Sequence, residues 1–310
     1  MSYDEIQKLL NEQAECRAKI NLIPFDGSIE VKEIKGERYL YARKREGGKN
    51  TSTYIDVYSD ELYESLMRQA VKKRELKKQL RRIEKQLAEQ DYSDEELSPR
   101  VVLNIDFARA NVKTLIYDQA VLEGISTTFP QTETILENGL VNGVRVQDVQ
   151  KILNLKHAWE FILDKDVILS ETNYYVLAHV AGMVNEGIFT NGGAVRSVPV
   201  TIGGTSYIPP LPIEADVKEA INNILSVDES PIDKAIKLCL YCMKTQIFID
   251  GNKRASIIFA NHYMVQNGEG LLVVPESKVE EFKRLLVSYY EGRNEKKIIK
   301  FFKDECWRKF

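Results

Sequence analysis

The residues best suited to chemistry lie together at positions 246–254, in the order Gln-Ile-Phe-Ile-Asp-Gly-Asn-Lys-Arg. This segment lies between two apolar helical runs and opens directly into the second one. A helix N-terminus presents unpaired N–H groups and the positive end of the helix dipole, and Gly251 lets an anion approach the backbone because it has no Cβ. Lys253 and Arg254 add positive charge beside it. The pattern therefore predicts a phosphate-binding site.

Two further residues of the segment suit the same chemistry. Asp250 supplies a hard carboxylate oxygen, which Mg²⁺ prefers when its other ligands come from a triphosphate. Phe248 would anchor the loop by burying its ring. The alternative is an ordinary helix start, with Asp-Gly-Asn as turn chemistry and Lys-Arg as surface charge. Composition alone leaves both interpretations open.

The segment resembles the signature of the Fic/Doc (Fido) family, His-x-Phe-x-Asp/Glu-Gly/Ala-Asn-Gly/Lys-Arg. It matches at six positions, Phe248, Asp250, Gly251, Asn252, Lys253 and Arg254, and its Lys-Arg ending is the Doc-like variant. With the segments described below, the resemblance covers roughly residues 101–290. It implies a helical Fido domain that binds ATP or a related nucleotide with Mg²⁺ and transfers AMP to a hydroxyl of a target protein.

The resemblance also implies a role for each matched residue. Asp250 would bind Mg²⁺, Gly251 and Asn252 would surround the α-phosphate, and Lys253 and Arg254 would point toward the outer phosphates. Residues 192–196, a predicted hairpin at 198–207 and the two prolines that follow it are similar to the family's target-docking flap. The centre of that flap would be Ile202, Gly203 and Gly204.

Residues 117–128 are similar to the family's inhibitory helix, whose signature is Ser/Thr-x-x-x-Glu-Gly/Asn. Glu123 would be the regulatory glutamate, although Gln119 replaces the Ser/Thr of the signature. The arginine that this glutamate contacts in inhibited members is replaced here by Ile257, so Glu123 would have to reach Lys253 or Arg254. The alternative is that Glu123 simply ends a helix before a capping glycine.

Gln246 stands where the family has its catalytic histidine, the general base for the target hydroxyl. An amide has no basic lone pair in the useful range, and losing a positioned base typically costs about 10²–10⁴-fold in rate. Two explanations stay open: a pseudoenzyme that still binds nucleotide, or an enzyme that uses another proton acceptor or a more acidic nucleophile. Asp250, His179 and His262 are the candidates for that acceptor, although each histidine lies on an apolar helical run.

The elements that must position these residues are mainly helical. Helical periodicity predicts a main domain over residues 96–310, with helices at 101–121, 146–163, 170–187, 213–224, 231–245, 253–267 and 277–290. Residues 90–99, rich in Asp, Glu and Ser, are typical of a hinge. The predicted fold class is therefore mainly α, a helical Fido domain with a β-hairpin flap.

Residues 1–95 are predicted to form a separate appendage. It would contain a short helix at 3–20, a three-stranded β-meander at 28–58 and a coiled-coil arm starting at residue 60. The arm would use a seam made by Leu62, Leu66, Leu76, Leu80, Ile83 and Leu87. Lys73 and Gln69 interrupt this seam, and residues 72–82 are densely basic. The arm suggests self-association as a homodimer, or capture of a partner.

Composition sets limits on the function. A net charge of −3 and a pI near 5.9 argue against a protein that coats nucleic acid with its whole surface, although a local basic stripe remains compatible. No apolar stretch is long enough for a signal peptide or a membrane span, so the default expectation is a cytoplasmic protein. The four cysteines, including the Cys239/Cys242 pair, are expected to be reduced thiols.

A second class of function stays open. The meander and basic arm could bind nucleic acid or a protein partner, with the Fido domain as scaffold. A Doc-like toxin or kinase is a third alternative, which the Lys253-Arg254 ending allows but the large N-terminal half does not favour.

Overall fold

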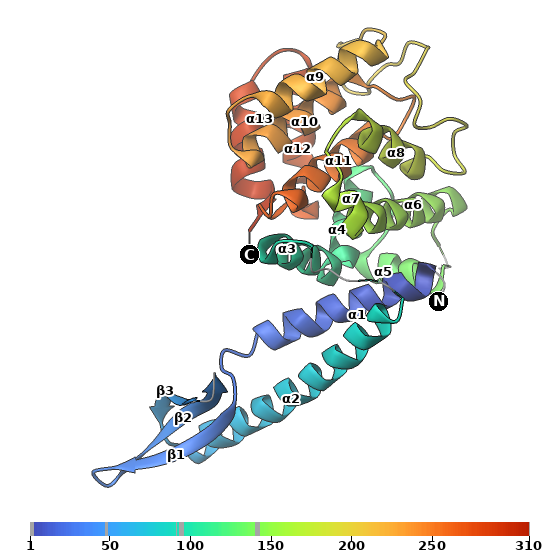
Figure 1. Ribbon diagram of the computed structural model, residues 1–310. Coiled ribbons are helices and arrows are strands. Elements are labelled where there is room, and N and C mark those ends of the chain that lie inside the picture. The colour runs from blue at the N-terminus through green and yellow to red at the C-terminus, as the bar shows by residue number, and fades with distance from the viewer. Residues whose placement is uncertain (1–2, 47–48, 91, 93–95, 140–142, 310) are drawn as a thin grey trace. The chain divides into compact units, whose positions relative to one another are not determined.

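The structure is a computed structural model that describes residues 3–46, 49–90, 92, 96–139 and 143–309. It divides into two compact units, Met1–Ser93 and Asp94–Phe310. The sequence placed this boundary two residues later. Figure 1 shows a mixed first unit and an almost entirely helical second unit.

The first unit consists of two helices and a sheet. Helix α1 (Tyr3–Asn21) leads into an antiparallel sheet of β1 (Ser28–Ile34), β2 (Glu37–Glu46) and β3 (Lys49–Val57), and α2 (Asp60–Ala88) follows. The meander prediction is confirmed, and its first turn has Lys35 and Gly36 at positive φ. The second predicted turn, at residues 47–50, begins outside the described residues.

The leucine seam of α2 packs within the chain. Leu76, Leu80, Ile83 and Leu87 lie in one cluster with apolar residues of α1, among them Leu10 and Cys16. Lys73, which interrupts the seam, donates from Nζ to the carbonyl oxygens of Ile23 (2.8 Å) and Phe25 (2.7 Å). The polar interruption therefore binds the backbone of the connection between α1 and the sheet.

The second unit is built from helices of 5 to 17 residues. They are α3 (Pro99–Ala110), α4 (Val112–Leu122), α5 (Phe129–Asn138), α6 (Val146–Ile162), α7 (Lys165–Leu169), α8 (Tyr174–Val184), α9 (Glu214–Ser226), α10 (Pro231–Thr245), α11 (Asn252–Gln266), α12 (Val279–Tyr290) and α13 (Glu295–Phe301). Short 3₁₀ and π turns lie at Glu276–Lys278 and Phe302–Cys306, and β4 (Leu271–Leu272) pairs with β5 (Trp307–Arg308).

Helix α11 is the central helix of this unit. Phe259 and Ile258 pack in one apolar cluster with α4, α6 and α8, whereas Ile257 and Met264 pack in a second cluster with α10 and α12. Other helices therefore cover α11 on both sides, and even its polar Asn261 and His262 are buried. The first turn of α11, which contains the phosphate-binding pattern, is therefore held by both halves of the core.

Two predictions about elements were wrong. The helix predicted at 101–121 is divided at Asn111, whose side-chain amide donates to Phe107 O (2.8 Å) as the backbone leaves helical geometry. The hairpin predicted at 198–207 is irregular chain without strands. Its ends are bound to the Arg196 side chain, and the prolines that follow have no N–H to donate to a ladder. Helices α5, α7 and α13 and the β4–β5 pair were not predicted.

Two further expectations concern thiols and membranes. Cys16, Cys239, Cys242 and Cys306 are all buried and free, as expected. Burial raises the pKa of the Cys239 and Cys242 thiols well above their ordinary value, so both stay protonated. Along the parts of the chain that the structure describes, no helix has an apolar run long enough to span a bilayer.

Candidate functional site

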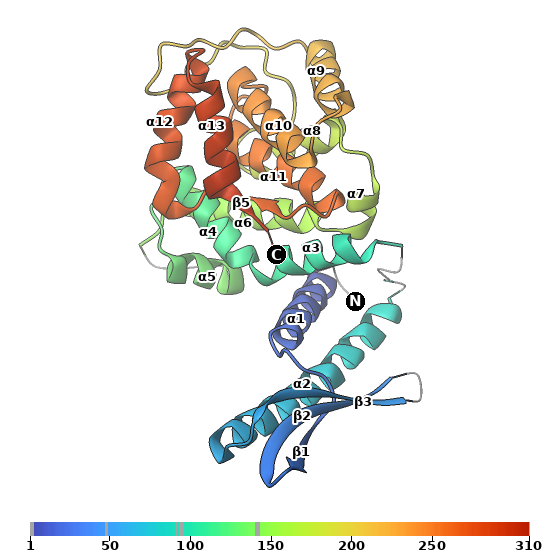
Figure 2. The ribbon, with the colours of Figure 1, turned by 90° about the vertical axis from the view of Figure 1, so that its left-hand side faces the viewer.

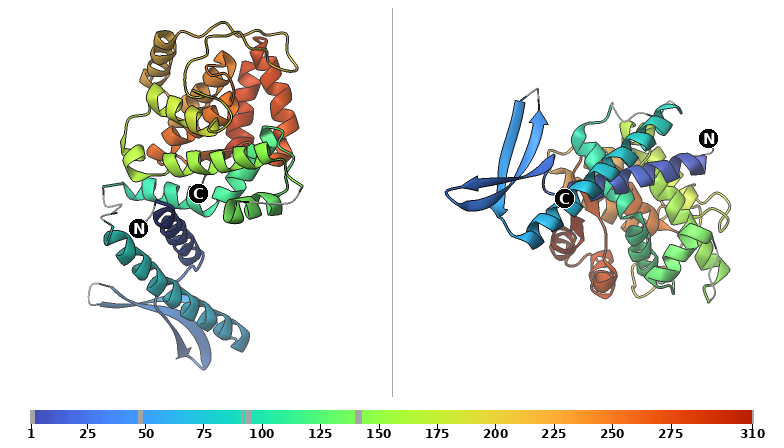
Figure 3. Two further views of the ribbon diagram at one scale, coloured as in Figure 1. Left: turned by 90° about the vertical axis from the view of Figure 1, so that its right-hand side faces the viewer. Right: turned by 90° about the horizontal axis from the view of Figure 1, so that it is seen from below.

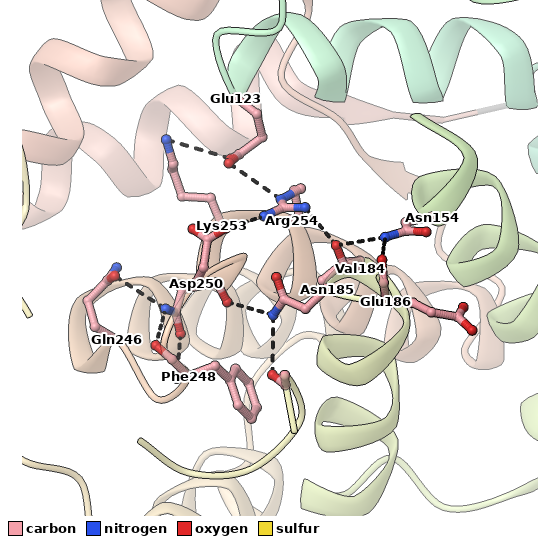
Figure 4. A network of polar contacts seen from close by, with 12 residues as sticks. Glu123, Asn154, Val184, Asn185, Glu186, Gln246, Phe248, Asp250, Lys253 and Arg254 are labelled. Atoms are coloured by element: carbon pink, nitrogen blue, oxygen red, sulfur yellow. Dashed lines mark hydrogen bonds and ion pairs between the residues drawn. The ribbon is translucent and has the colours of Figure 1, made fainter. Parts of the chain in front are cut away.

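The loop between α10 and α11 is held by two left-handed residues and one asparagine. Gln246 ends α10 at φ 49°, and Gly251 precedes α11 at φ 73°. The Asn252 side chain accepts from Phe248 N (2.9 Å) and donates to Phe248 O (2.8 Å), which closes the loop from inside. Phe248 is only 1% exposed, as its expected anchoring role requires. These contacts fix the path of the chain into α11 (Figure 4).

The side chain of Gln246 is bound at both ends. Its Nε2 donates to Met243 O (2.6 Å), and its Oε1 accepts from Asn252 Nδ2 (3.3 Å). The amide thus links the last turn of α10 to the first residue of α11. A glutamine can make both bonds because its amide has a donor and an acceptor.

The guanidinium of Arg254 is almost completely buried, with its side chain 1% exposed. It donates from Nη1 to Val184 O (2.7 Å) and from Nη2 to Asp250 Oδ2 (2.8 Å). Its Nε lies 3.6 Å from Glu123 Oε2, which is too long for a hydrogen bond. A buried cation must be paired, and here two carboxylates share it.

Glu123 reaches both cations of the loop. Its Oε1 lies 3.6 Å from Lys253 Nζ, and its Oε2 faces Arg254 (Figure 4). The turn before it is fixed by Gln119, which donates to Arg254 O (2.9 Å) and accepts from Trp159 Nε1 (3.1 Å). Glu123 therefore lies beside Lys253 and Arg254, the two cations that it was predicted to reach. Ile257 lies in the apolar core.

The missing Cβ of Gly251 faces α8. A Cβ built there would lie 2.9 Å from Asn185 Oδ1 and 3.1 Å from Val184 Cγ2. The sequence predicted that a phosphate would occupy this space, but the Asn185 side chain occupies it. Asn185 itself donates to Asp250 O (2.9 Å) and Gly192 O (3.2 Å). Glycine is needed here for positive φ and for packing.

Three buried polar atoms around this first turn lack a hydrogen-bond partner among the described residues: Glu123 Oε1, Asn185 Oδ1 and Arg254 Nε. Native proteins rarely leave such atoms unsatisfied, so each one calls for a water, an ion or a ligand. Gly251 also provides no side-chain cap for the α11 N–H groups. The site therefore combines spare donors and acceptors with two cations.

A second arginine ties residues 198–213, which we call the strap, to the loop. Arg196 is 4% exposed. It donates from Nε to Gln246 O (2.6 Å), from Nη1 to Val198 O (2.8 Å) and from Nη2 to Pro210 O (2.6 Å). Burial of the guanidinium lowers the pKa of Arg196. This side chain joins both ends of the strap to the base position of the motif.

The middle of the strap carries the three residues predicted for the flap. Ile202 packs against the second apolar cluster, whereas Gly203 and Gly204 are exposed. Tyr207 stacks on Tyr290 at 6.2 Å, which fixes this part of the strap on α12. Figure 2 shows the strap running between α9 and the end of α12.

Neither candidate histidine lies at the motif. His262 is fully buried and hydrogen-bonded through Nδ1 to Thr172 Oγ1 (2.8 Å) and through Nε2 to Val167 O (2.8 Å). His179 lies on the exposed side of α8, with its ring 4.5 Å from that of Phe161. The structure thus gives neither residue a contact with Gln246 or Asp250.

Four surface pockets formed by the described residues lie away from the loop; the largest is between α12 and α13. At the loop, Glu123 and Asp250 lie against Arg254. Asn185 and Trp159 support the site but carried no signal in one sequence, because each acts through backbone or amide contacts from a distant element. Arg196 lies in the segment 192–196 that was compared with the flap, but its bond to Gln246 O was not predicted.

Comparisons with known proteins match two segments of this chain. A model described as "Fic/DOC family" matches residues 172–264, and one described as "Domain of unknown function (DUF6788)" matches residues 3–64. Curated relatives include "Protein adenylyltransferase Fic" of Drosophila willistoni, 26% identical over 193 residues, and that of Drosophila grimshawi, also 26% identical. These matches cover 57% of this chain but only 36% and 38% of those proteins.

Solved structures share the fold. "Fic-1 (aa134 - 508) from C. elegans" aligns with a TM-score of 0.53 at 17% identity, over 79% of this chain and 74% of that one. A Fic domain containing signaling protein from Bacteroides thetaiotaomicron aligns with a TM-score of 0.51 at 18% identity, over 66% of this chain and 80% of that one. The predicted mainly helical Fic-like fold is confirmed, without the hairpin flap. Residues 172–264 thus match the Fic/DOC family model, and the chain is distantly similar to Fic protein adenylyltransferases.

Proposed function

We propose that this protein binds ATP or a related nucleotide at the first turn of α11, and that it transfers AMP to a protein hydroxyl slowly or not at all. The observation that carries the proposal is the unsatisfied buried donor there, Arg254 Nε, next to Lys253 and to an α11 N-terminus without a side-chain cap. A polyphosphate supplies the acceptor oxygens that this donor and the uncapped helix end need.

Glu123 would regulate this binding. Its carboxylate lies where an anion would meet Lys253 and Arg254, at 3.6 Å from a nitrogen of each. Two anions cannot share the same cations without repulsion. A bound polyphosphate would therefore replace Glu123 at these cations.

Asp250 suits a magnesium ion that is bound together with the nucleotide. Its side chain is 44% exposed and gives one oxygen, Oδ2, to Arg254, so Oδ1 remains for a metal. Among the described residues no group of three or more His, Cys, Asp or Glu could hold a metal. The remaining ligands would be phosphate oxygens and waters, as is usual for Mg²⁺. Bound there, the ion would neutralise phosphate charge.

Gln246 limits catalysis for two reasons. In AMP transfer a hydroxyl oxygen attacks the α-phosphorus, pyrophosphate leaves, and the hydroxyl proton needs an acceptor. The Gln246 amide is not basic, and both of its ends are bound within the loop. Positioning and charge supply most of the catalysis in phosphoryl transfer, so slow transfer can survive the loss of the base.

A target protein would meet the strap. Ile202, Gly203 and Gly204 lie at its centre, and Arg196 connects it to Gln246 O. A protein hydroxyl presented along the strap would therefore be close to the base position.

The test is AMP transfer with α-labelled ATP and Mg²⁺ to the chain itself and to proteins of a cell extract. Gln246→His should raise transfer about 10²-fold or more, because it restores a base near neutral pH. Gln246→Asn is the matched control, since it perturbs the same hydrogen bonds without adding a base. If Gln246→His binds ATP and folds like the parent but transfers no more AMP than Gln246→Asn, the lost-base explanation is wrong.

A further inference from the structure

We propose that the exposed face of the β1–β3 sheet binds single-stranded nucleic acid. We call this surface the tyrosine face, made by Lys32, Tyr39, Tyr41, Arg43, Arg45 and Tyr54. The inference concerns the first unit alone and does not depend on nucleotide binding by α11.

The sheet has one covered and one open face. Leu40 and Ala42 of β2 are buried in a cluster with Leu66 of α2. Alternate residues of a strand point to opposite faces, so Tyr39 and Tyr41 point away from α2. Figure 3 shows α2 along one face of the sheet and no other element of this unit on the opposite face. Aromatic side chains on a free sheet face require an explanation.

The tyrosine rings form a continuous aromatic surface. Tyr41 meets Tyr54 on β3 edge to face, with centroids 5.7 Å apart and planes at 76°. Tyr39 also contacts Tyr54, at 6.2 Å and 56°. Tyr54 is 52% exposed. Rings held by their neighbours but open on one side can stack on bases with little loss of side-chain entropy, as in sheet-based RNA readers.

Cations continue this surface along β2. Arg43 and Arg45 follow Tyr41 at steps of two residues, so they share its face at intervals of about 7 Å. Both are exposed, and neither has an ion pair within the described part of the chain. Arg43 lies between Ser28 and Ser52, which leaves its guanidinium room to move. In a bound strand, the bases would stack on the tyrosine rings, and the phosphates would lie near the free guanidinium groups.

The acidic residues of the same face already have partners. Glu30 lies 3.7 Å from Lys32 Nζ and accepts from Ser52. Glu37 accepts from the Tyr39 hydroxyl at 2.6 Å. Lys32 in turn lies 4.5 Å from the centre of the Tyr41 ring. Glu37 keeps its charge, because its partner is a neutral hydroxyl, but Arg43 and Arg45 outnumber it. The charge left for a ligand is therefore positive, which favours a polyanion with aromatic groups over an apolar protein surface.

The experiment is fluorescence anisotropy of the full chain with labelled oligothymidylate and oligouridylate of about 15 nucleotides. Two arms with DNA and RNA distinguish the natural source. Tyr54→Ala should weaken binding by roughly 5- to 100-fold, and Tyr54→Phe by less than about twofold, because the ring stacks. Arg43→Gln with Arg45→Gln should lower the slope of log K against log salt by about 1.4.

The matched control is Arg74→Gln with Lys78→Gln, which removes two exposed cations from α2 in the same unit. It should leave the stacking-dependent part of binding intact. Circular dichroism and melting of each variant report on folding, and Tyr54 is exposed enough for truncation to be tolerated. Equal affinity of Tyr54→Ala and the parent, or equal displacement of the oligonucleotide by polyglutamate of matched charge, would overturn the proposal.

Discussion

Removing the charge of Glu123 should strengthen nucleotide binding. The change Glu123→Gln keeps the size of the side chain but removes the carboxylate that lies 3.6 Å from both Lys253 Nζ and Arg254 Nε. A nucleotide phosphate would then meet two cations without first displacing an anion. Arg254 would keep its bonds to Asp250 and Val184 O, so the loop should remain folded.

The size of the effect follows from these contacts. Glu123 is 13% exposed, Lys253 is 31% exposed, and neither 3.6 Å contact is a hydrogen bond. The partly screened pair with Lys253 contributes up to about 1 kcal/mol. We assign about 1 kcal/mol also to the pair with Arg254, which is only 1% exposed but keeps Asp250 as its hydrogen-bonded partner. Displacing both would cost a nucleotide about 2 kcal/mol, which corresponds to about 30-fold in Kd.

Isothermal titration calorimetry with ATP and Mg²⁺ measures this difference. Glu133→Gln is the matched control, because Glu133 pairs with Lys113 at 2.9 Å on the surface of α5, in the same unit but on a different cation. The control should bind ATP like the parent. If Glu123→Gln binds ATP no tighter than Glu133→Gln, Glu123 does not compete with phosphate and the regulatory role is refuted.

Three further predictions concern the support of the site. Gly251→Ala should lower the free energy of unfolding in urea by about 2–4 kcal/mol, because its Cβ is strained at positive φ and crowds Asn185; no loss would contradict this. Arg196→Lys loses the guanidinium fork, so limited proteolysis should cut within residues 198–213 faster than in the parent. Burial lowers the pKa of His262 below its ordinary 6.5. The free energy of unfolding should therefore be highest above about pH 6.5 and should decrease at lower pH, where the unfolded chain binds the proton more readily. His262→Gln should flatten this pH dependence of the free energy of unfolding.

The sequence predicted the parts of this protein that depend on local pattern. Helical periodicity located α10 and α11 within a residue or two, and the alternation at residues 28–58 located the sheet. The six motif positions were enough to identify the Fic-like fold of the second unit. Such features are visible because each rests on residues close together in the chain.

The arrangement of charges around the motif was beyond one sequence. Asp250 and Arg254 are one helical turn apart, yet their pairing depends on Val184 of α8, which holds the guanidinium from the other side. Asn185 fills the space at Gly251 from the same distant helix. Gln246 was expected at the base position, but not its bonds to Met243 O and Asn252. Such contacts depend on packing between elements that are far apart in the chain, and hydrophobic periodicity does not reveal that packing.

The central claim is that a polyphosphate binds at the first turn of α11. A crystal structure with a non-hydrolysable ATP analogue and Mg²⁺, at a concentration well above the calorimetric Kd, tests it most directly. We expect phosphate oxygens within hydrogen-bond distance of the N–H groups of residues 252–254 and of Arg254 Nε, with Glu123 moved off both cations. A nucleotide bound elsewhere, with Glu123 still against Lys253 and Arg254, would contradict the claim.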